Sequence, residues 1–221
     1  MGIGRGGTLL LGQAVSPDRP KPYRLADVTL VPDAIDQNMS PLLKTGRIFR
    51  AFFVGSKDRY GRRAVHLVGD GTRWVQADML AAGRAFALPR PGVSASCRAA
   101  LRAMEQDGER NTRGVWSGSS PVLPASDLAR LYEQRGAFVL VEGKVLSVGD
   151  RARRVYLNFG ETWSEDFTVS LAKSGRGAFN GDLTRLLAAK GKTLRVRGVL
   201  DWSGGPLIRV MDEGQIEFVE P

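Results

Sequence analysis

Arginine is the residue type whose number and placement in this chain could do chemistry. The 221 residues include 32 Lys and Arg against 23 Asp and Glu, for a formal net charge of +9. Residues 1–125 hold 18 basic and 10 acidic side chains, whereas residues 126–221 hold 14 and 13. The guanidinium group donates paired hydrogen bonds to phosphate. We therefore expect the first half to contact a polyanion, the alternative being a surface that positive charge keeps soluble.

Other kinds of site are poorly represented. One histidine, His66, and one cysteine, Cys97, supply neither a zinc ligand set nor a disulfide framework. We expect His66 to be packed or exposed rather than catalytic, and Cys97 to lie in the core. No apolar run reaches about 18 residues, so no membrane-spanning helix is expected. No signal-peptide pattern begins the chain, which leaves cytoplasmic, periplasmic and secreted locations open.

The first half is expected to fold as a small barrel flanked by helices. Short β-type runs separated by Gly, Pro and Asp cover residues 8–11, 23–30, 47–54 and 64–68. Two helices are predicted after them. The first spans residues 74–82 and ends at Gly83, a glycine suited to the C-cap. The second spans residues 94–107, has one apolar stripe that includes Cys97, and is expected to end at Gly108.

The second half is expected to form another barrel. A Ser/Gly/Pro stretch at residues 116–124 predicts a linker, and a helix over residues 126–134 should begin at Ser126. Alternating strands are predicted at residues 138–146, 154–159, 167–171, 194–200 and 206–210, with a helix near 179–189 between the third and fourth. That is the element order of an OB barrel. We thus predict a mainly β, α+β chain: a barrel domain at 1–116, a linker and helix at 117–135, and an OB-like domain at 136–221.

Two segments resemble the staphylococcal nuclease (thermonuclease) family. Arg24-Leu25-Ala26-Asp27-Val28 and Asp58-Arg59-Tyr60-Gly61-Arg62 are similar to its signature segments, and the likeness extends over residues 5–116. It implies an OB barrel with three helices. It also implies a site in which two arginines, here Arg24 and Arg62, hold a phosphodiester beside a calcium ion. In that family two aspartates and a backbone carbonyl bind the calcium, and a glutamate acts near the attacking water.

The metal ligands that the resemblance implies are replaced. Arg5 and Gly7 stand where the family has the two acids before Thr8, and Thr29 stands in place of a further aspartate. Asp33 falls near the glutamate position, with a shorter side chain. Calcium binds about six to eight oxygens, with carboxylates prominent, so we expect no metal and at most a vestigial catalytic set of Arg24, Arg62 and Asp33. We do not count Asp27 as a ligand, because a shift of one residue along a strand reverses the side chain.

Residues 136–221 resemble the OB-like domain of some bacterial thermonuclease-family proteins. The likeness lies in Arg154–Gly160, Trp163, residues 166–169 and residues 195–198. OB barrels stack bases on aromatic side chains in a basic groove. The candidate stacking residues are Tyr156, Phe159, Trp163 and Trp202, with Arg151, Arg153, Arg154, Arg195 and Arg197 nearby. These aromatics could equally be core residues.

The sequence therefore favours a nucleic-acid-binding protein that has lost or weakened nuclease activity. Phosphate contacts would come from Arg24, Arg59, Arg62 and Arg63, and the partner would be DNA or RNA. One alternative is an active phosphodiesterase whose metal, such as calcium, is held by Asp27 and Asp33. A second is a protein that binds a protein partner and no nucleic acid. Arg24 could also simply pair with Asp27 or Asp58, and the Arg62 loop could be a solvated turn.

Overall fold

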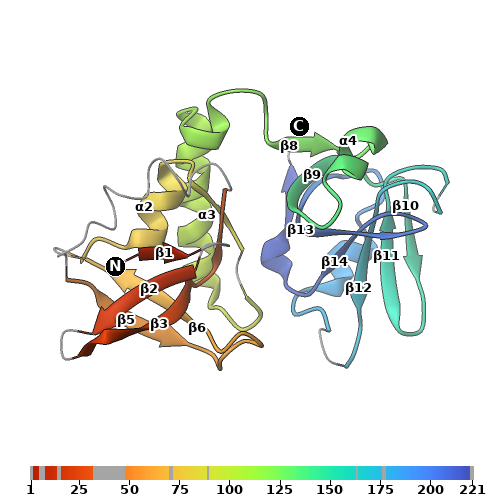
Figure 1. The fold of residues 1–221 in the computed structure, drawn as a ribbon. Helices are drawn as coiled ribbons and strands as arrows, with labels where there is room; N and C mark the ends of the chain where they lie inside the picture. Colours follow the sequence, from red (N-terminus) through yellow and green to blue (C-terminus); the bar gives the residue numbers. More distant parts are fainter. Residues whose placement is uncertain are drawn as a thin grey trace. The chain divides into compact units, whose positions relative to one another are not determined.

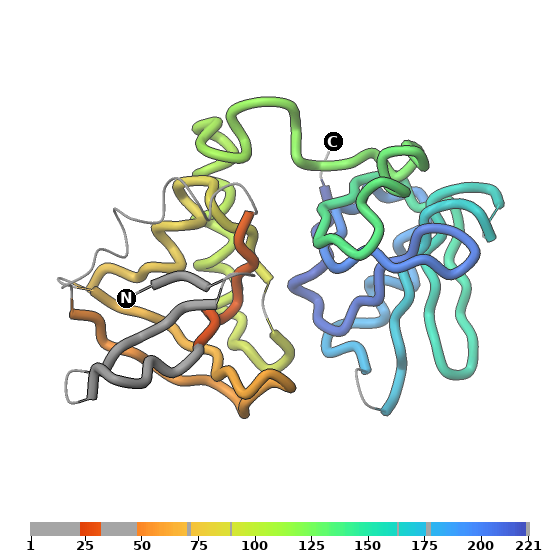
Figure 2. The backbone as a smooth tube through the Cα atoms, in the orientation of Figure 1, coloured from red at the N-terminus to blue at the C-terminus, as the bar shows by residue number. Residues whose placement is uncertain are grey.

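A computed structural model describes most of the chain. The described residues are 2–4, 8–13, 16–31, 48–69, 72–88, 90–162, 164–175 and 178–219. For residues before 23 the description is of the backbone alone. Figure 2 traces this path in colour. The predictions for Arg5, Gly7, Asp33 and Trp163, and for the side chain of Thr8, lie outside the described part.

The fold is mainly β with helices, as predicted, and belongs to the α+β class (Figure 1). The chain forms two compact units: Met1–Ala87 with Ser94–Ser119, and Leu88–Val93 with Ser120–Pro221. The connecting helix predicted in residues 117–135 belongs to the second unit. No helix in the described segments is long and apolar enough to cross a bilayer.

The first unit contains a five-stranded sheet. Its strands are β1 (Gly2–Gly4), β2 (Thr8–Gln13), β3 (Ser16–Leu25), β5 (Arg50–Val54) and β6 (Arg63–Val68). Their order across the sheet is β1-β2-β3-β6-β5. β3 and β6 run parallel, with Arg24 opposite Ala64, and the other neighbours are antiparallel. The end of β3 therefore lies beside the start of β6, where the loop that carries Arg59 and Arg62 finishes.

Two helices and a short ribbon complete this unit. The helices are α2 (Val75–Ala81) and α3 (Ala95–Arg110), and the ribbon pairs β4 (Val28–Leu30) with β7 (Ala85–Ala87). α3 begins at Ser94, whose Oγ accepts a hydrogen bond from the Cys97 amide. The core is formed by apolar side chains of the sheet and both helices, among them Leu25, Val65, Leu67, Met79 and Leu101. Cys97 is partly buried and packs against this cluster.

Gly108 does not end a helix, contrary to the prediction. It lies inside α3, which continues to Arg110 with Asn111 as its C-cap. A Cβ atom at Gly108 would come within 2.6 Å of the Leu80 carbonyl oxygen. The glycine thus permits α2 and α3 to approach closely, a tertiary requirement that local sequence does not reveal.

The second unit contains a sheet whose strand order is that of an OB barrel. Its strands are β9 (Phe138–Lys144), β10 (Ser147–Asp150), β11 (Arg154–Asn158), β12 (Thr168–Ala172), β13 (Thr193–Ser203) and β14 (Gly205–Val210). They follow the order β10-β11-β12-β14-β13-β9, with β12 and β14 parallel. The Val145 amide donates to the Lys192 carbonyl oxygen, just before β13, and the Leu146 amide donates to the Asn158 carbonyl oxygen, at the end of β11. Since β9 and β10 are nearly continuous, this switch of partners closes the barrel.

Helix α5 (Leu183–Leu187) lies between β12 and β13, as the OB order predicted, although it is shorter than residues 179–189. The two sheets share a strand order when β9 and β10 are counted as one strand, and the parallel pair β12–β14 then corresponds to the parallel pair β3–β6. The interior of the second unit is filled by alternating apolar residues such as Val155, Leu157, Val169 and Ile208.

Two local predictions in the second half were wrong, and strands β10 and β15 were not predicted. The end of the predicted linker forms β8 (Val122–Pro124), which pairs in parallel with β9. Helix α4 (Leu128–Glu133) begins at Asp127, whose carboxylate accepts from the Arg130 amide, and not at Ser126. β15 (Ile216–Val219) pairs with β13 and was not predicted. In each case a neighbouring strand or an adjacent cap residue outweighs the local composition.

Candidate functional site

The loop between β5 and β6 is organised around the Asp58 carboxylate. Its Oδ1 accepts hydrogen bonds from the Tyr60 and Arg62 amides, both at 2.9 Å. Its Oδ2 accepts from Arg62 Nε, also at 2.9 Å. Gly61 takes the positive φ of +74° that the turn requires. The loop is therefore a bonded turn, not a simple solvated one.

These bonds set the protonation of Asp58. Partial desolvation raises the pKa of the Asp58 carboxyl, but the hydrogen bonds from Arg62 and Tyr60 and the charge of Arg62 lower it further. The net result is a pKa below the ordinary value of 3.8. Asp58 is thus a firm anion at neutral pH.

Arg24 and Arg62 converge on that anion. Arg62 Nε lies 2.9 Å and Arg24 Nε 3.9 Å from Asp58 Oδ2. The pairing of Arg24 with Asp58, one of the sequence alternatives, is what the structure contains. The Arg24 side chain remains 36% exposed. The two guanidinium groups can therefore reach a single anionic centre from β3 and from the loop.

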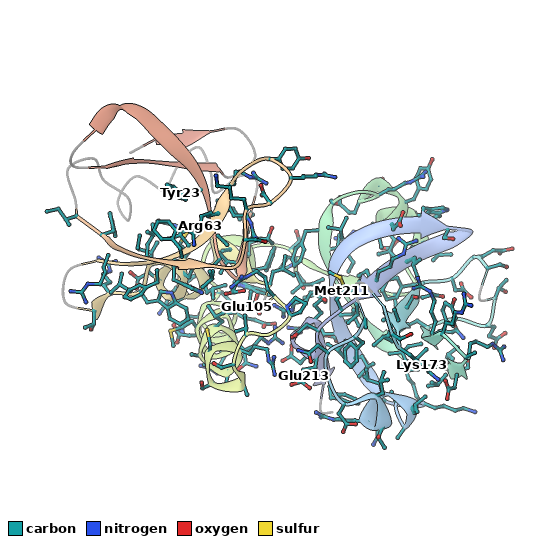
Figure 3. The ribbon with its side chains drawn as sticks, turned by 90° about the horizontal axis from the view of Figure 1, so that it is seen from below. Tyr23, Arg63, Glu105, Lys173, Met211 and Glu213 are labelled. Carbon is teal, nitrogen blue, oxygen red and sulfur yellow. The ribbon has the colours of Figure 1, made fainter. Side chains whose placement is uncertain are left out.

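Arginines and aromatic rings form one surface around this loop. Arg59 and Arg62 place their Cζ atoms 4.8 and 4.9 Å from the Tyr60 ring centroid. Arg63 lies 4.7 Å from the Phe53 centroid, and Phe53 in turn packs on Tyr23. Figure 3 shows Arg63 and Tyr23 on this side of the first unit. We call the arginine–aromatic surface the set Arg24, Phe53, Arg59, Tyr60, Arg62 and Arg63.

The aromatic members of this surface were missed by sequence reasoning. Tyr60 is 62% exposed and Phe53 42% exposed, so both rings present surface to a partner molecule. The signal was present in the alternation of rings with arginines through residues 50–63. It is weak in sequence, because a strand phenylalanine is more often buried.

Asp27 is buried and contacts His66. It adopts a positive φ of +60°, its side chain is fully buried, and its Oδ2 lies 3.0 Å from His66 Nε2. His66 Nδ1 accepts a hydrogen bond from Trp74 Nε1 at 3.3 Å. With Nδ1 acting as an acceptor, the imidazole proton lies on Nε2 and points at Asp27. Both ring nitrogens are engaged, which agrees with a packing role for His66.

The described residues near Arg24 do not fit a calcium site. Calcium requires several oxygen ligands with carboxylates prominent. Asp27 is buried against His66, and Thr29 on β4 offers a hydroxyl only. Across the part of the chain that the structure describes, no three Asp, Glu, His or Cys side chains gather as a metal-binding group would.

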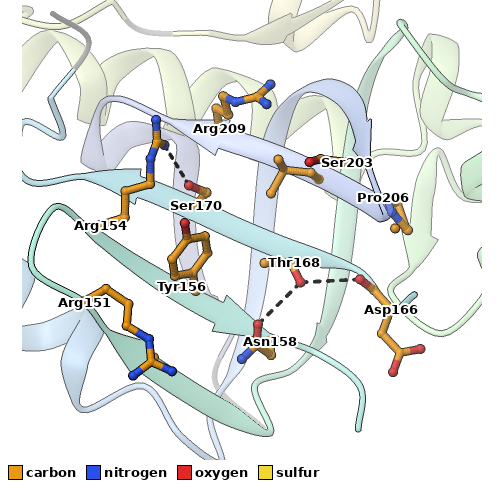
Figure 4. Close-up of a pocket in the computed structure, with 13 residues that line it drawn as sticks. Arg151, Arg154, Tyr156, Asn158, Asp166, Thr168, Ser170, Ser203, Pro206 and Arg209 are labelled. Carbon is orange, nitrogen blue, oxygen red and sulfur yellow. Dashed lines mark hydrogen bonds between the residues drawn. The ribbon is translucent and has the colours of Figure 1, made fainter. Parts of the chain in front are cut away.

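A second feature is a groove of about 650 Å³ in the second unit. It is formed by the outer faces of β11, β12 and β14 and by the β10–β11 and β13–β14 turns (Figure 4). We call it the β11–β12–β14 groove. Of the four predicted stacking residues, Tyr156 lines it.

The other described candidates lie elsewhere. Phe159 packs on Phe167 and the core, with ring centroids 5.0 Å apart. Trp202 packs edge-on against Tyr132 of α4. Arg195 pairs with Glu142 on the neighbouring strand, and Arg197 is buried. Both arginines lie in the part of β13 that pairs with β9 and β15, whereas β14 of the groove pairs with residues 200–203.

Comparison with protein-family models gave no match, and comparison with curated proteins gave none either. The geometry above is therefore the basis for the functional proposals that follow.

Proposed function

We propose that this protein binds nucleic acid through its phosphate backbone at the arginine–aromatic surface. The observation that carries the proposal is the gathering of Arg59 and Arg62 within 4.9 Å of the centroid of one exposed ring, Tyr60. Guanidinium groups bind phosphate oxygens, and an exposed ring accepts a nucleobase. The two together are the chemistry of a nucleic-acid strand.

The charge of the surface supports this proposal. The loop and its flanks supply five basic residues, Arg24, Lys57, Arg59, Arg62 and Arg63, against the single acid Asp58. Asp58 is shared by Arg24 and Arg62. Within the described segments, neither Arg59 nor Arg63 forms an ion pair with a carboxylate. Two cations on this surface are thus available to an incoming phosphate.

Binding without efficient cleavage fits the side chains best. Phosphodiester hydrolysis requires a large barrier reduction, much of which a metal ion supplies by polarising the phosphoryl oxygen. Two arginines can neutralise the charge of a phosphate, but they do not activate the attacking water molecule. The active phosphodiesterase alternative relied on Asp27, whose carboxylate is held by His66.

The test compares two double variants of the full chain. Arg59→Ala/Arg63→Ala removes two surface cations and leaves the Asp58 turn intact, since neither side chain bonds to Asp58. Arg110→Ala/Arg130→Ala removes two exposed arginines from α3 and α4 as a matched control. Binding of labelled single- and double-stranded DNA is measured by fluorescence anisotropy at about 50 mM salt, where phosphate contacts are strong.

We expect the first pair to weaken binding at least about 10-fold and the control pair to change it much less. Equal behaviour of the two pairs, or no binding by the wild type, contradicts the proposal. Incubation of labelled DNA with calcium, magnesium or manganese, against a chelator, tests the enzyme alternative. Chelator-sensitive cleavage that Arg62→Ala abolishes would establish that alternative instead.

A further inference from the structure

We propose that the β11–β12–β14 groove is a separate binding site for a short single-stranded segment of nucleic acid, with one base stacked on Tyr156. The groove belongs to the second unit and shares no residue with the arginine–aromatic surface. The proposal therefore goes beyond the proposed function and is tested apart from it.

Strand register places the groove residues in two rows. Tyr156 pairs with Ser170, and Ser170 with Arg209, across β11, β12 and β14. In the second row, two residues further along β11, Asn158 pairs with Thr168. Neighbouring strands lie about 4.8 Å apart, so an aromatic ring, hydroxyls and an arginine share one outer face. Figure 4 shows Tyr156 and Arg154 on this face, with Asn158 and Thr168 at its far end.

Two arginines give the groove a positive end. Arg154 Nη1 donates to the Ser170 hydroxyl at 3.0 Å, and Arg151 is exposed in the β10–β11 turn. In the described parts of the chain, neither forms an ion pair with a carboxylate. The acids around the groove are already engaged. Asp201 pairs with Arg209, Asp150 pairs with Lys173, and Asp166 accepts from the Thr162 amide.

The opposite end carries amide and hydroxyl groups beside the Asp166 carboxylate. Asn158 and Thr168 lie side by side there, and the Thr168 hydroxyl contacts the Asn158 carbonyl oxygen at 3.4 Å. Amide and hydroxyl groups of this kind can donate to and accept from the edges of a base. A nucleotide fits this order of groups, with its phosphate at Arg151 and Arg154, its base on Tyr156 and its base edge towards Asn158.

The ligand class follows from this arrangement. A nucleobase can stack on Tyr156 only if it is not paired with a base of a complementary strand. The site therefore selects unpaired nucleotides over a duplex. The volume of about 650 Å³ lies within the roughly 300–1,000 Å³ of small-ligand sites. That space suits one or two nucleotides of a strand that continues beyond the groove.

The test uses the full chain carrying Arg59→Ala/Arg63→Ala, so that binding at the arginine–aromatic surface is reduced. The probe is a fluorescent thymidine oligonucleotide of about eight nucleotides, within the roughly 4–16 that one OB fold covers. Tyr156→Ala, Tyr156→Phe and Arg151→Ala are compared with the control Arg130→Ala. Thermal unfolding of each variant confirms that the barrel remains folded.

We expect Tyr156→Ala to weaken binding roughly 5- to 150-fold, the effect of removing one stacked base. Tyr156→Phe should retain affinity because the ring remains, and Arg130→Ala should match its parent. A duplex of the same length should compete poorly. Equal affinities of Tyr156→Ala and its parent, in folded protein, overturn the proposal.

Changes in the amide chemical shifts of the ¹⁵N-labelled wild type distinguish binding in the groove from binding at the arginine–aromatic surface. Shifts across residues 149–158, 168–170 and 203–209 on addition of the oligonucleotide support the groove. Shifts confined to residues 23–25 and 50–68 leave the proposed function standing and reject the groove. The absence of shifts in both regions rejects both.

Discussion

Asp58 is the residue on which the geometry of the candidate surface depends. One carboxylate binds two loop amides and the Arg62 side chain, and lies 3.9 Å from Arg24. A carboxylate is a good partner here because charged acceptors make hydrogen bonds about twice as strong as neutral ones. Asp58 thus fixes the positions of the Arg24 and Arg62 side chains, and it does not bond to Arg59 or Arg63.

Stability should depend on Asp58 at acid pH. The pKa of its carboxyl in the folded protein lies below the ordinary 3.8. Its contribution is therefore complete above about pH 4 and is lost as pH falls through the folded-state pKa. Urea unfolding should show the wild type losing more stability than Asp58→Asn below about pH 4. Parallel stability curves for the two proteins would exclude this role.

Tyr60 should matter for binding rather than for folding. It is 62% exposed, so its removal uncovers little core. Tyr60→Ala should weaken single-strand binding by roughly 5- to 150-fold if a base stacks on it, and Tyr60→Phe should keep most of the affinity. Phe52→Ala, which removes an exposed ring from the adjacent strand, is the control in the same anisotropy titration. A comparable loss in the control would mean that the effect is not specific to Tyr60.

Among single residues, the sequence indicated the arginines of the surface but not the aromatic side chains around them. Arg24, Arg59, Arg62 and Arg63 are brought together, as an arginine-rich site required. Phe53 and Tyr60 were not foreseen, because whether a strand or loop aromatic is buried depends on which elements cover it. The contact of Asp27 with His66 arises from a parallel strand pairing that no local pattern shows.

Among the elements, the turn after α2 is the most constrained. Gly83 has φ +63°, and a Cβ atom there would lie 1.9 Å from the Arg113 carbonyl oxygen. Gly83→Ala should lower the free energy of unfolding by more than the about 1–2 kcal/mol of left-handed strain alone. Gly61→Ala has similar strain but no atom within 4 Å of the added Cβ, so it should cost less. Equal unfolding midpoints in urea would contradict the packing explanation.

Helix α3 carries a buried acid that should make the first unit sensitive to pH. Burial raises the pKa of the Glu105 carboxyl above its ordinary 4.5, despite the charge of Arg102 and the hydrogen bond from the Ala87 amide. A raised pKa stabilises the fold fully below about 4.5, and this contribution is lost as pH rises through the folded-state value. As pH rises above about 4.5, urea unfolding of Glu105→Gln should therefore show a smaller loss of stability than that of the wild type. An unchanged pH profile would contradict this assignment.

Elements with regular periodicity were predicted well and isolated ones poorly. The strands of the second barrel and α3 follow from alternation and from a helical stripe. β8 was taken for linker, because its three residues are stabilised by pairing with β9 and not by their own propensity. The length of α3 was misjudged at Gly108, where close packing against Leu80 requires the glycine.

For the molecule as a whole, the two units carry different surfaces of similar chemistry. The net charge of +9 is concentrated in residues 1–125, whereas the groove of the second unit depends on few charges and one ring. A basic protein attracts polyanions at long range, and under our two proposals the exposed ring of each unit then favours unpaired bases. We expect the full chain to bind single strands with less dependence on salt than duplexes, in keeping with the weaker counterion release from single strands.

The most direct measurement is the slope of log affinity against log salt for a DNA duplex, for the wild type and for Arg59→Ala/Arg63→Ala. Each phosphate contact contributes about −0.9 to the slope. We expect a negative slope that becomes about 1.8 units shallower in the double variant, while Arg110→Ala/Arg130→Ala keeps the wild-type value. Identical slopes for all three proteins would contradict it.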